Sequence, residues 1–497
     1  MDARFLQRLS GFGQASGDAL RGPELSPRRV LGTTSACVLA VLLGCLFMDG
    51  FTVDDALISV SYARSLAAGH GYRLCAACTV SDGVTPLPWA FLLAPLGRLG
   101  PFDLLRVAQG LGVLATLGCA LLVGIRAARA QGALGYLLCA SMGLCLPVAA
   151  YAVSGMETPV PTLLCTCCVF CMYRPALCAV LGGLAAAFRP ELAPWAVIIA
   201  FGAQLVAQGS VAPRAVLRGV AIGALAAVPF LGCAAARLFL WGRPYPLSLL
   251  AKPSDVSHGA VYVAAACLVA AGPLLLVSRR PLLLEEITLR PTLVVGMAFV
   301  AHVLVVLLVG GDWMPYARLL VPVLPGLWLA AVPLAVGRGG AMRIGAAILI
   351  GAIFLFGAGR EGRGISVARH DVSRELAARP GLGRVASVDI GWVSATVGDV
   401  LDLAGVTDAD IASLPGGHTS KRIDGAYLLG RGARTVLIYE VGGASGALSP
   451  VRDAELRLSR DALFLRHCTP EAFLPMAHSN PARRHGYRLY RCGPNEP

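Results

Sequence analysis

Long apolar runs, separated by short segments that carry arginine, are the feature that most constrains the fold of this chain. A helix of roughly 20 apolar residues spans the hydrocarbon core of a bilayer and satisfies its own backbone polar groups. Hydrophobic residues make up 56% of the chain and charged residues only 14%, with a mean hydropathy of +0.69. These values exclude an ordinary soluble enzyme. The sequence predicts a polytopic α-helical membrane protein.

About eleven runs are expected to cross the membrane. They occupy approximately residues 30–48, 103–125, 133–151, 158–173, 176–188, 191–208, 218–240, 259–278, 291–309, 318–337 and 341–358. Another apolar stretch, 84–95, is short and contains several prolines, which break the helical hydrogen-bond ladder. It is expected to form a half-inserted or interfacial helix in an outer loop that covers residues 49–102.

The arginines between these runs define the expected topology, because cytoplasmic loops of membrane proteins carry an excess of positive charge. With the N-terminal segment 1–29 in the cytoplasm, the basic loop residues fall on that same side: Arg126, Arg129, Arg174, Arg214, Arg218, Arg279, Arg280, Arg338 and Arg343. Topology therefore accounts for the formal net charge of +13, and nucleic-acid binding is not indicated. The membrane domain is expected to cover residues 30–359.

The composition changes after about residue 360, where long apolar runs end and charge rises. Short β-like pieces at 384–390 and 435–439 alternate with polar stretches, which indicates a soluble α+β domain over 360–497. An odd number of spans precedes this domain and places it on the non-cytoplasmic face. The arginine-rich piece 360–374 is expected to be a linker or an interfacial helix.

Most of the 16 cysteines lie in apolar runs, where they are expected to be small core residues. Four lie in predicted loops or in the C-terminal domain. If those regions face an oxidising compartment, two disulfides can form, Cys75 with Cys78 and Cys468 with Cys492.

The adjacent carboxylates Asp54 and Asp55 follow the first apolar run and are the leading candidates for a functional site. Two acids at a membrane edge cost desolvation and mutual repulsion, so ionisable residues there are functional candidates by default. A carboxylate here could take a proton from an acceptor hydroxyl, and the pair could hold a divalent cation. The structural alternative is that an aspartate caps the helix expected over 56–66. Tyr62 and Arg64 follow on that helix, where Tyr62 also suits an interface anchor.

Further charged residues lie at predicted span ends on the non-cytoplasmic face. Topology disfavours cations there, so a phosphate ligand would explain three of them: Arg243, Lys252 and Arg318. Their structural alternative is pairing with Asp255 and Asp312. Glu157 and Glu191 each begin a span, where the helix dipole favours an acid, and Arg189 stands beside Glu191, which suits a salt bridge or a polar head group.

Sequence motifs for nucleotide or metal cofactors are absent. The chain has neither a P-loop nor a dinucleotide-binding fingerprint, and His70 and His258 are too scattered for a metal cage. A phosphate-linked donor should therefore be membrane-borne. No cofactor is predicted, and a divalent cation stays an open alternative.

The first outer loop resembles that of the GT-C glycosyltransferase superfamily, specifically the bacterial arabinofuranosyltransferase (AftB-like) group, over residues 54–71 (DDALISVSYARSLAAGHG). Weaker matches follow in the family's order: 154–158 (SGMET), 189–191 (RPE), 246–252 (PLSLLAK), 311–322 (GDWMPYARLLVP), 389–391 (DIG) and 402–405 (DLAG). The similarity runs from about residue 50 to 440. It implies an integral membrane enzyme of the bacterial inner membrane whose site faces the periplasm.

The resemblance also implies residue roles. Asp54 would be the catalytic carboxylate with Asp55 in support, and Lys252 and Arg318 would contact a lipid phosphate. The cavity would be lined by Glu157, Arg189, Glu191 and Asp312. The donor would be a polyprenyl-phosphate sugar and the acceptor a cell-envelope glycan or glycolipid.

The chain departs from the family pattern at residues 81–89 (SDGVTPLPW), where the family tends to carry a Tyr- and Asn-containing run. The sugar is therefore undefined, pentosyl or hexosyl, with arabinofuranose as one candidate. Two other classes of function stay open: a transporter or flippase for a lipid-linked sugar, and an envelope-assembly scaffold with a degenerate site. Product formation by the purified protein in detergent separates a glycosyltransferase from a flippase, and a scaffold predicts that Asp54→Asn is silent in cells.

Overall fold

A computed structural model describes residues 25–493 except 131, 277–290, 332–337, 444–445 and 477–483. Most of the N-terminal segment 1–29, together with Arg279 and Arg280, lies outside the described residues. The chain divides into two compact units that are each discontinuous in sequence. Unit 1 comprises Met1–Asp49, Gln109–Cys233 and Ser254–Arg360, and unit 2 comprises Gly50–Ala108, Ala234–Pro253 and Glu361–Pro497.

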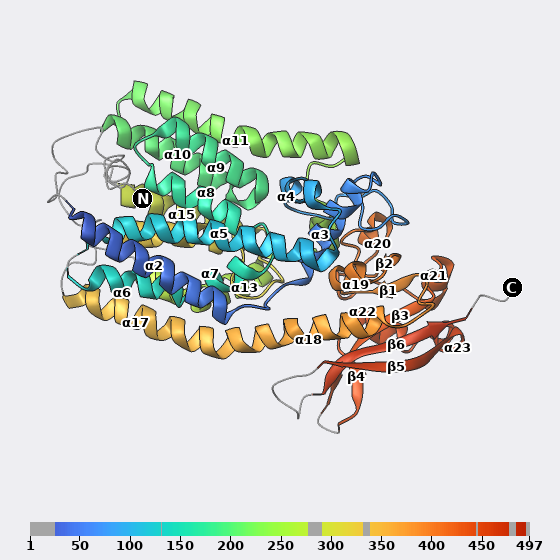
Figure 1. Ribbon diagram of the computed structural model, residues 1–497. Helices are drawn as coiled ribbons and strands as arrows, with labels where there is room; N and C mark the ends of the chain where they lie inside the picture. Colours follow the sequence, from blue (N-terminus) through green and yellow to red (C-terminus); the bar gives the residue numbers. More distant parts are fainter. Residues whose placement is uncertain are drawn as a thin grey trace. The chain divides into compact units, whose positions relative to one another are not determined.

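Unit 1 is built from apolar helices (Figure 1). Two of these helices, α5 (Pro101–Ala127) and α11 (Pro213–Trp241), also contribute residues to unit 2. Those wholly in unit 1 are α2 (Pro27–Phe47), α6 (Leu134–Gly143), α7 (Leu146–Val153), α8 (Pro159–Phe170), α9 (Pro175–Phe188), η3 (Pro190–Leu192), α10 (Ala193–Gln208), α13 (Val256–Val269), α14 (Ala271–Leu275), α15 (Pro291–Leu308), η5 (Val321–Val323), α16 (Leu324–Ala331), α17 (Arg338–Phe354) and the π-helical turn η7 (Leu355–Gly359).

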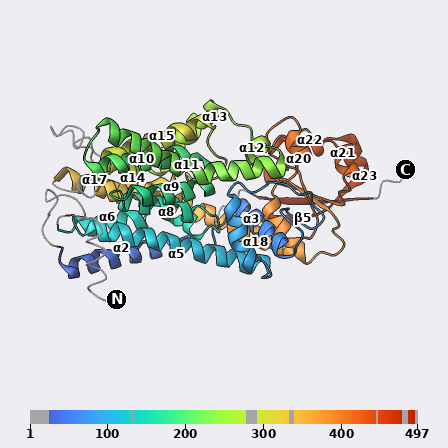
Figure 2. The same cartoon turned by 90° about the horizontal axis from the view of Figure 1, so that it is seen from above.

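Small residues bring the helices of unit 1 into close contact. Helices α8, α9 and α10 lie side by side, and a Cβ added at Gly182 of α9 would meet Ala196 of α10 at 3.1 Å (Figure 2). At the contact between α2 and α6, a Cβ at Gly143 would collide with the carbonyl of Ala40. Helices in a membrane associate through such close packing, because lipid supplies no hydrophobic drive between them.

The number of spanning helices is smaller than the sequence indicates. Among the described residues, six helices are long and apolar enough to cross a membrane, or seven if α6 and α7, which bend by 52°, form one span. The expected count of eleven is therefore wrong, although membrane-spanning character is supported. Four expected runs instead contain shorter apolar helices: α8, α9, α13 and α16.

Local breaks shorten α8, which ends at Phe170, α13 and α16, whereas α9 fills its expected run, which is itself short. Pro159 and Pro175 begin α8 and α9, and α13 ends at Val269 before the chain restarts as α14. Hydropathy averages over such breaks. The ends of the runs 259–278 and 318–337 also lie partly outside the described residues. The span count consequently no longer fixes the side of the membrane on which the C-terminal segment lies.

Unit 2 combines the first-loop helix with a small sheet and its covering helices. The outer-loop helix expected over 56–66 is confirmed as α3 (Asp54–Ala67), and the piece 360–374 lies in α18 (Arg360–Ala377), a continuation of α17 through η7 (Figure 1). The other elements are α4 (Leu87–Leu93), η2 (Ala94–Leu96), α12 (Leu247–Ala251), β1 (Val385–Ser387), α19 (Ile390–Thr396), β2 (Val400–Asp402), α20 (Ala409–Ser413), α21 (Gly425–Gly430), β3 (Thr435–Gly442), β4 (Leu448–Pro450), α22 (Asp453–Leu458), α23 (Ala462–His467), β5 (Cys468–Met476) and β6 (His485–Cys492).

The sheet of unit 2 is mixed, with strand order β2-β1-β3-β6-β5 and β4 beside β3. Strand β1 runs parallel to both neighbours, with Val385 opposite Val400 and Thr435. Strands β3, β6 and β5 are antiparallel, so Thr435 also faces Arg491. Strand β3 is buried over Thr435–Ile438, as a strand paired on both sides and covered by helices should be. The expected strand at 435–439 is present within β3, whereas only Val385–Ser387 of the expected piece 384–390 forms a strand and Ile390 already begins α19.

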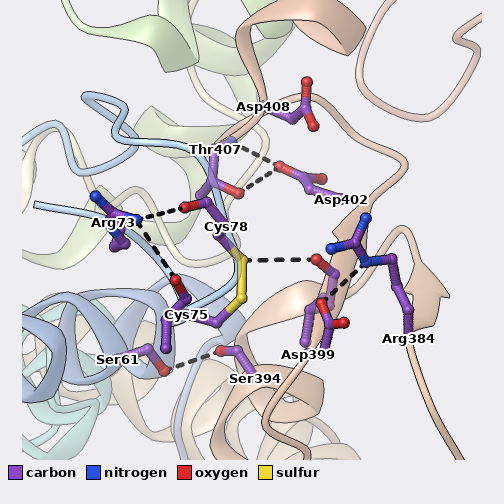
Figure 3. The surroundings of a disulfide bond; sticks show 12 residues. Ser61, Arg73, Cys75, Cys78, Arg384, Ser394, Asp399, Asp402, Thr407 and Asp408 are labelled. Atoms are coloured by element: carbon purple, nitrogen blue, oxygen red, sulfur yellow. Dashed lines mark hydrogen bonds and ion pairs between the residues drawn. A yellow bond between two sulfur atoms is a disulfide. The ribbon is translucent and has the colours of Figure 1, made fainter. Parts of the chain in front are cut away.

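Both expected cysteine pairs are disulfides in the structure: Cys75–Cys78 and Cys468–Cys492. The second joins β5 to β6, where the two cysteines face each other across the ladder. The first closes a tight turn in the outer loop, and its Cys78 sulfur lies 3.6 Å from the carbonyl oxygen of Val400 (Figure 3). Two segments that are far apart in sequence thus meet inside unit 2.

Replacing Cys468 and Cys492 with serine is expected to lower the unfolding free energy of unit 2 by about 3 kcal/mol, because the disulfide closes a long loop in the unfolded chain. The sequence separation is 24 residues. The matched double replacement of Cys75 and Cys78, which are separated by 3, should cost less. Denaturant unfolding of the full chain measures both, and an equal cost would contradict the loop-closure explanation.

Candidate functional site

Asp54 does not cap its own helix. Helix α3 begins at Asp54 itself, and its capping position, Val53, offers no side-chain bond. The Asp54 carboxylate instead accepts hydrogen bonds from the backbone N–H groups of Gly391 at 2.8 Å and Trp392 at 2.9 Å. These amides lie in the first turn of α19, where backbone donors lack partners within the helix. The capping alternative is therefore wrong for α3, and Asp54 satisfies a different helix.

A second carboxylate, Asp389, lies close to Asp54 at the start of α19 and anchors a network of charged and polar groups. Its Oδ2 atom accepts from Arg452 Nη2 at 2.7 Å and from the Tyr487 hydroxyl at 2.6 Å. Arg452 also pairs with the buried Glu455 at 3.3 Å. The network joins α19, the first turn of α22 and β6.

The two carboxylates have opposite pKa shifts. Burial raises the pKa of Asp54 to about 7, and the charge of Asp389 adds to this, while Arg369 and the two amides oppose it. Burial would also raise the pKa of Asp389, but Arg452 and Arg369 hold that pKa well below its usual range. Asp389 is therefore the charged member of the pair, and Asp54 titrates near neutrality.

The raised pKa of Asp54 predicts a pH-dependent contribution to stability. Its unfolded value is about 3.8, so the folded chain holds a proton that the unfolded chain loses between about pH 4 and 7. The contribution is therefore present at low pH and is lost as the pH rises toward 7. We expect the free-energy difference between wild type and Asp54→Asn to shrink by about 1–3 kcal/mol from pH 4.5 to pH 8, measured by denaturant unfolding. A difference that is constant with pH would contradict this.

Asp55, the neighbour of Asp54, is paired differently and is accessible. Its Oδ2 atom lies 3.6 Å from the Nζ atom of Lys252, and the two side chains are 22% and 14% exposed. Lys252 directly follows the short helix α12. His418, from the loop after α20, lies within electrostatic range of both. Burial and the neighbouring Lys252 lower the pKa of His418 to about 4, so this imidazole is neutral at pH 7.

A small cavity lies beside Asp54 rather than beside Asp55. It has a volume of about 30 Å³ and polar lining from Asp54, Ser366, Arg369, His370 and Ser373. A buried water needs roughly 10–15 Å³, so the cavity holds one or two waters and excludes a sugar.

The other outer-loop candidates have structural contacts. Tyr62 is fully buried, and its hydroxyl lies 2.9 Å from the Ser81 hydroxyl. Arg64 donates to the carbonyl of Leu99 at 3.1 Å near the surface. Both residues lie two turns or more along α3 from Asp54. The structure therefore does not place them with the Asp55–Lys252 pair.

The candidates of unit 1 form a separate set of ion pairs. Arg189 lies 3.3 Å from Glu157 and 3.1 Å from Glu191. Arg318 makes a two-pronged contact with Asp312, at 2.6 and 2.9 Å. The chain turns back for this contact through Tyr316 and Ala317, whose φ angles of 58° and 56° are left-handed.

The sequence offered ion pairs with Asp255 and Asp312 as the structural alternative, and only the pair with Asp312 is present. Arg318 does pair with Asp312, but Lys252 pairs with Asp55, because Asp255 caps α13 by accepting from His258 N at 2.8 Å. The guanidinium of Arg318 is thus already occupied by a carboxylate, whereas the ammonium of Lys252 has a looser partner. Lys252 is the better candidate for an anion.

Sequence reasoning missed most of the network around Asp54. Asp389 was matched only through the family resemblance, and Arg369 lies in the arginine-rich piece that was expected to be a linker or an interfacial helix. No pattern singled out His418, Arg452 or Tyr487, since each is an isolated polar residue in a soluble segment. Within the described ranges, no group of three or more histidine, cysteine or acidic side chains is arranged to hold a metal ion.

No protein-family model, curated protein or solved structure matches this chain. The chemistry of the site therefore follows from its own groups. An accessible carboxylate can accept a proton from a hydroxyl, and an ammonium beside it can bind an anion. Asp54, the neighbour of Asp55, is fixed to α19 by its two amide hydrogen bonds.

Proposed function

We propose that this chain is a membrane glycosyltransferase of GT-C type, which moves a sugar from a polyprenyl-phosphate donor to a cell-envelope glycan or glycolipid. The observation that carries the proposal is the accessible Asp55–Lys252 pair at the start of the outer-loop helix α3. The resemblance of residues 54–71 to the arabinofuranosyltransferase group supports it, and arabinofuranose is one candidate sugar. The apolar helices suit a protein that takes its donor from the membrane.

The proposed reaction uses the two members of the pair in different roles. Asp55 takes the proton from the acceptor hydroxyl, and the oxygen of that hydroxyl forms a bond to the anomeric carbon of the sugar. The bond from that carbon to the phosphate oxygen breaks, and polyprenyl phosphate leaves with the electron pair. Lys252 stabilises the negative charge on the departing phosphate, and positioning supplies much of the rate enhancement.

This assignment exchanges the roles that the resemblance implies for the two aspartates. Both oxygens of Asp54 already accept amide hydrogen bonds, and Asp54 borders a cavity too small for a sugar. Asp54 therefore positions α3 against α19, and Asp55 meets the substrate. We assign the phosphate contact to Lys252 and not to Arg318, because the guanidinium of Arg318 is paired with Asp312.

The proposed location is a bacterial plasma membrane with the site facing the periplasm. Disulfides persist in oxidising compartments, and both disulfides of this chain lie in unit 2, which carries Asp55 and Lys252.

Lys252→Met is expected to weaken binding of a short-chain polyprenyl phosphate by about 10-fold or more, because a charge-assisted hydrogen bond contributes about 1.5–3 kcal/mol. Arg106→Gln is the matched control, since its side chain is 78% exposed and pairs only with the neighbouring Asp103 in α5. Calorimetric titration of both variants in detergent measures the effect. Equal affinities of Lys252→Met and Arg106→Gln for the polyprenyl phosphate would show that Lys252 does not bind the phosphate.

A lipid-linked sugar transporter is the second candidate, and one observation favours it. Transporters place ionisable groups inside the helix bundle, and Glu157 and Arg189 of unit 1 are fully or almost fully buried. A transporter makes no glycosylated product when no sealed compartment is present. Product formation by the purified protein in detergent separates the two candidates.

A further inference from the structure

The Asp55–Lys252 pair joins two segments of unit 2 that are far apart in sequence. Asp55 is the second residue of α3, and Lys252 directly follows α12. Their charged atoms lie 3.6 Å apart and both side chains are partly exposed. An ion pair of this kind contributes little to stability, so it does not by itself hold α12 beside α3. Other residues must set the distance between the two helices.

A buried segment of the outer loop, residues 81–85, is packed against α3. The Ser81 hydroxyl donates to the carbonyl of Thr407 at 2.5 Å and lies 2.9 Å from the hydroxyl of Tyr62, a residue of α3. Gly83 passes the same hydroxyl so closely that an added Cβ would lie 2.5 Å from it. Segment 81–85 is therefore fixed in position relative to α3.

The same segment also holds α12. The backbone N–H of Leu247 donates to the carbonyl of Asp82 at 3.1 Å, and the hydroxyls of Thr85 and Ser248 lie 2.8 Å apart. Leu247 and Ser248 are the first two residues of α12, the helix that Lys252 follows. One short segment thus contacts both the helix that carries Asp55 and the helix that precedes Lys252.

Arg237, near the end of α11, fixes this segment from its buried side. Its Nε atom donates to Asp82 Oδ2 at 2.7 Å, and its Nη2 atom donates to the carbonyl of Thr85 at 2.6 Å. The side chains of Arg237 and Asp82 are 2% and 0% exposed. A buried pair needs such additional hydrogen bonds to be held in one geometry. Thr85 is consequently fixed through its carbonyl by Arg237 and contacts α12 through its hydroxyl.

We propose that residues 81–85 form a strut that positions Lys252 against Asp55, and that Arg237 is a positioning residue behind this strut. The strut sets the distance between α3 and α12, and with it the distance between the proton acceptor and the phosphate-binding cation. Its consequence for sugar transfer rests on the proposed function of that pair. The strut itself is a property of the fold and can be tested separately.

Thr85→Val removes the hydroxyl contact with Ser248 and keeps the shape of the side chain. In the full-length protein in detergent, the amides of residues 247–252 should then exchange with D2O several-fold faster than in wild type, as measured by mass spectrometry. Binding of a short-chain polyprenyl phosphate should weaken by about 3- to 10-fold in a calorimetric titration, the effect of one hydrogen bond. Thr396→Val is the matched control, because Thr396 is also half-buried and its hydroxyl donates within α19. This control should change neither quantity.

Two further variants and a double variant separate positioning from general destabilisation. Ser248→Ala removes the other half of the hydroxyl contact and should reproduce both effects, so it gives the answer if Thr85→Val does not fold. Arg237→Lys keeps a charge beside Asp82 but loses the two-pronged donation, and it should weaken binding at least as much. In the Lys252→Met background, Thr85→Val should weaken binding no further, because the strut acts through Lys252.

Unchanged exchange of residues 247–252 in both Thr85→Val and Ser248→Ala would overturn the strut. An equal loss of affinity from Thr85→Val with and without Lys252→Met would overturn its action through Lys252. If Lys252→Met binds the phosphate as tightly as wild type, the phosphate site of the proposed function fails instead, and the exchange rates still decide whether the strut exists.

Discussion

Asp55→Asn is expected to lower the rate of sugar transfer by about 10²- to 10⁴-fold, the range that a positioned general base contributes. The amide keeps the size of the side chain but cannot take the acceptor proton. Because Asp55 is 22% exposed and its pair with Lys252 is long, the fold should tolerate the change. The loss should therefore appear in kcat, with the KM for the lipid-linked donor changed much less.

Two control variants make this result specific. Asp103→Asn removes an exposed carboxylate from the same unit and should leave the rate unchanged. Asp54→Asn should reduce stability, since an amide nitrogen would face the donors of Gly391 or Trp392, and should reduce the rate less than Asp55→Asn in the folded fraction. If Asp54→Asn abolishes transfer while Asp55→Asn retains it, the roles of the two aspartates are reversed.

Arg452→Met is expected to destabilise unit 2 by about 3–5 kcal/mol, because it leaves the Asp389 carboxylate buried without its closest cation. Glu455 would lose the same cation, whereas the hydrogen bond from the Tyr487 hydroxyl to Asp389 would remain. Trp392, whose ring centre lies 5.0 Å from that of Tyr487, reports on this region by fluorescence during denaturant unfolding.

Arg379→Met is the matched control for this experiment. Its pairs with Glu375 and Glu471 are partly exposed, and such pairs contribute about 0–1 kcal/mol. If Arg379→Met and Arg452→Met lower the free energy of unfolding by similar amounts, the network around Asp389 contributes no more to stability than a partly exposed ion pair.

The positions of the helices could be predicted from the sequence, but which of them are long enough to cross a membrane could not. Apolar runs located a helix at every expected span, yet α8 and α9 are too short to cross, because α8 ends at Phe170 and the run that forms α9 is itself only 14 residues long. The bend between α6 and α7 is equally invisible to hydropathy. Helix α3 was predictable because Ala56 to Leu66 lacks breakers and follows two acids.

Only the part of the site that consists of residues adjacent in sequence could be predicted. Asp54 and Asp55 stood out as adjacent acids beside an apolar run. Their different roles depend on partners far away in sequence: Gly391 is 337 residues from Asp54, and Lys252 directly follows the short helix α12. Spacing contains no information about such contacts, because the fold alone brings them together.

The measurement that tests the central claim most directly is transfer by the purified protein in detergent micelles. A polyprenyl-phosphate sugar and a short glycan acceptor are supplied, and the glycosylated product is quantified by mass spectrometry for wild type and for Asp55→Asn. A glycosyltransferase should form product without any sealed compartment, and the variant should form almost none. No product from wild type over a panel of pentosyl and hexosyl donors, combined with movement of the same lipids across sealed vesicles, would contradict the account.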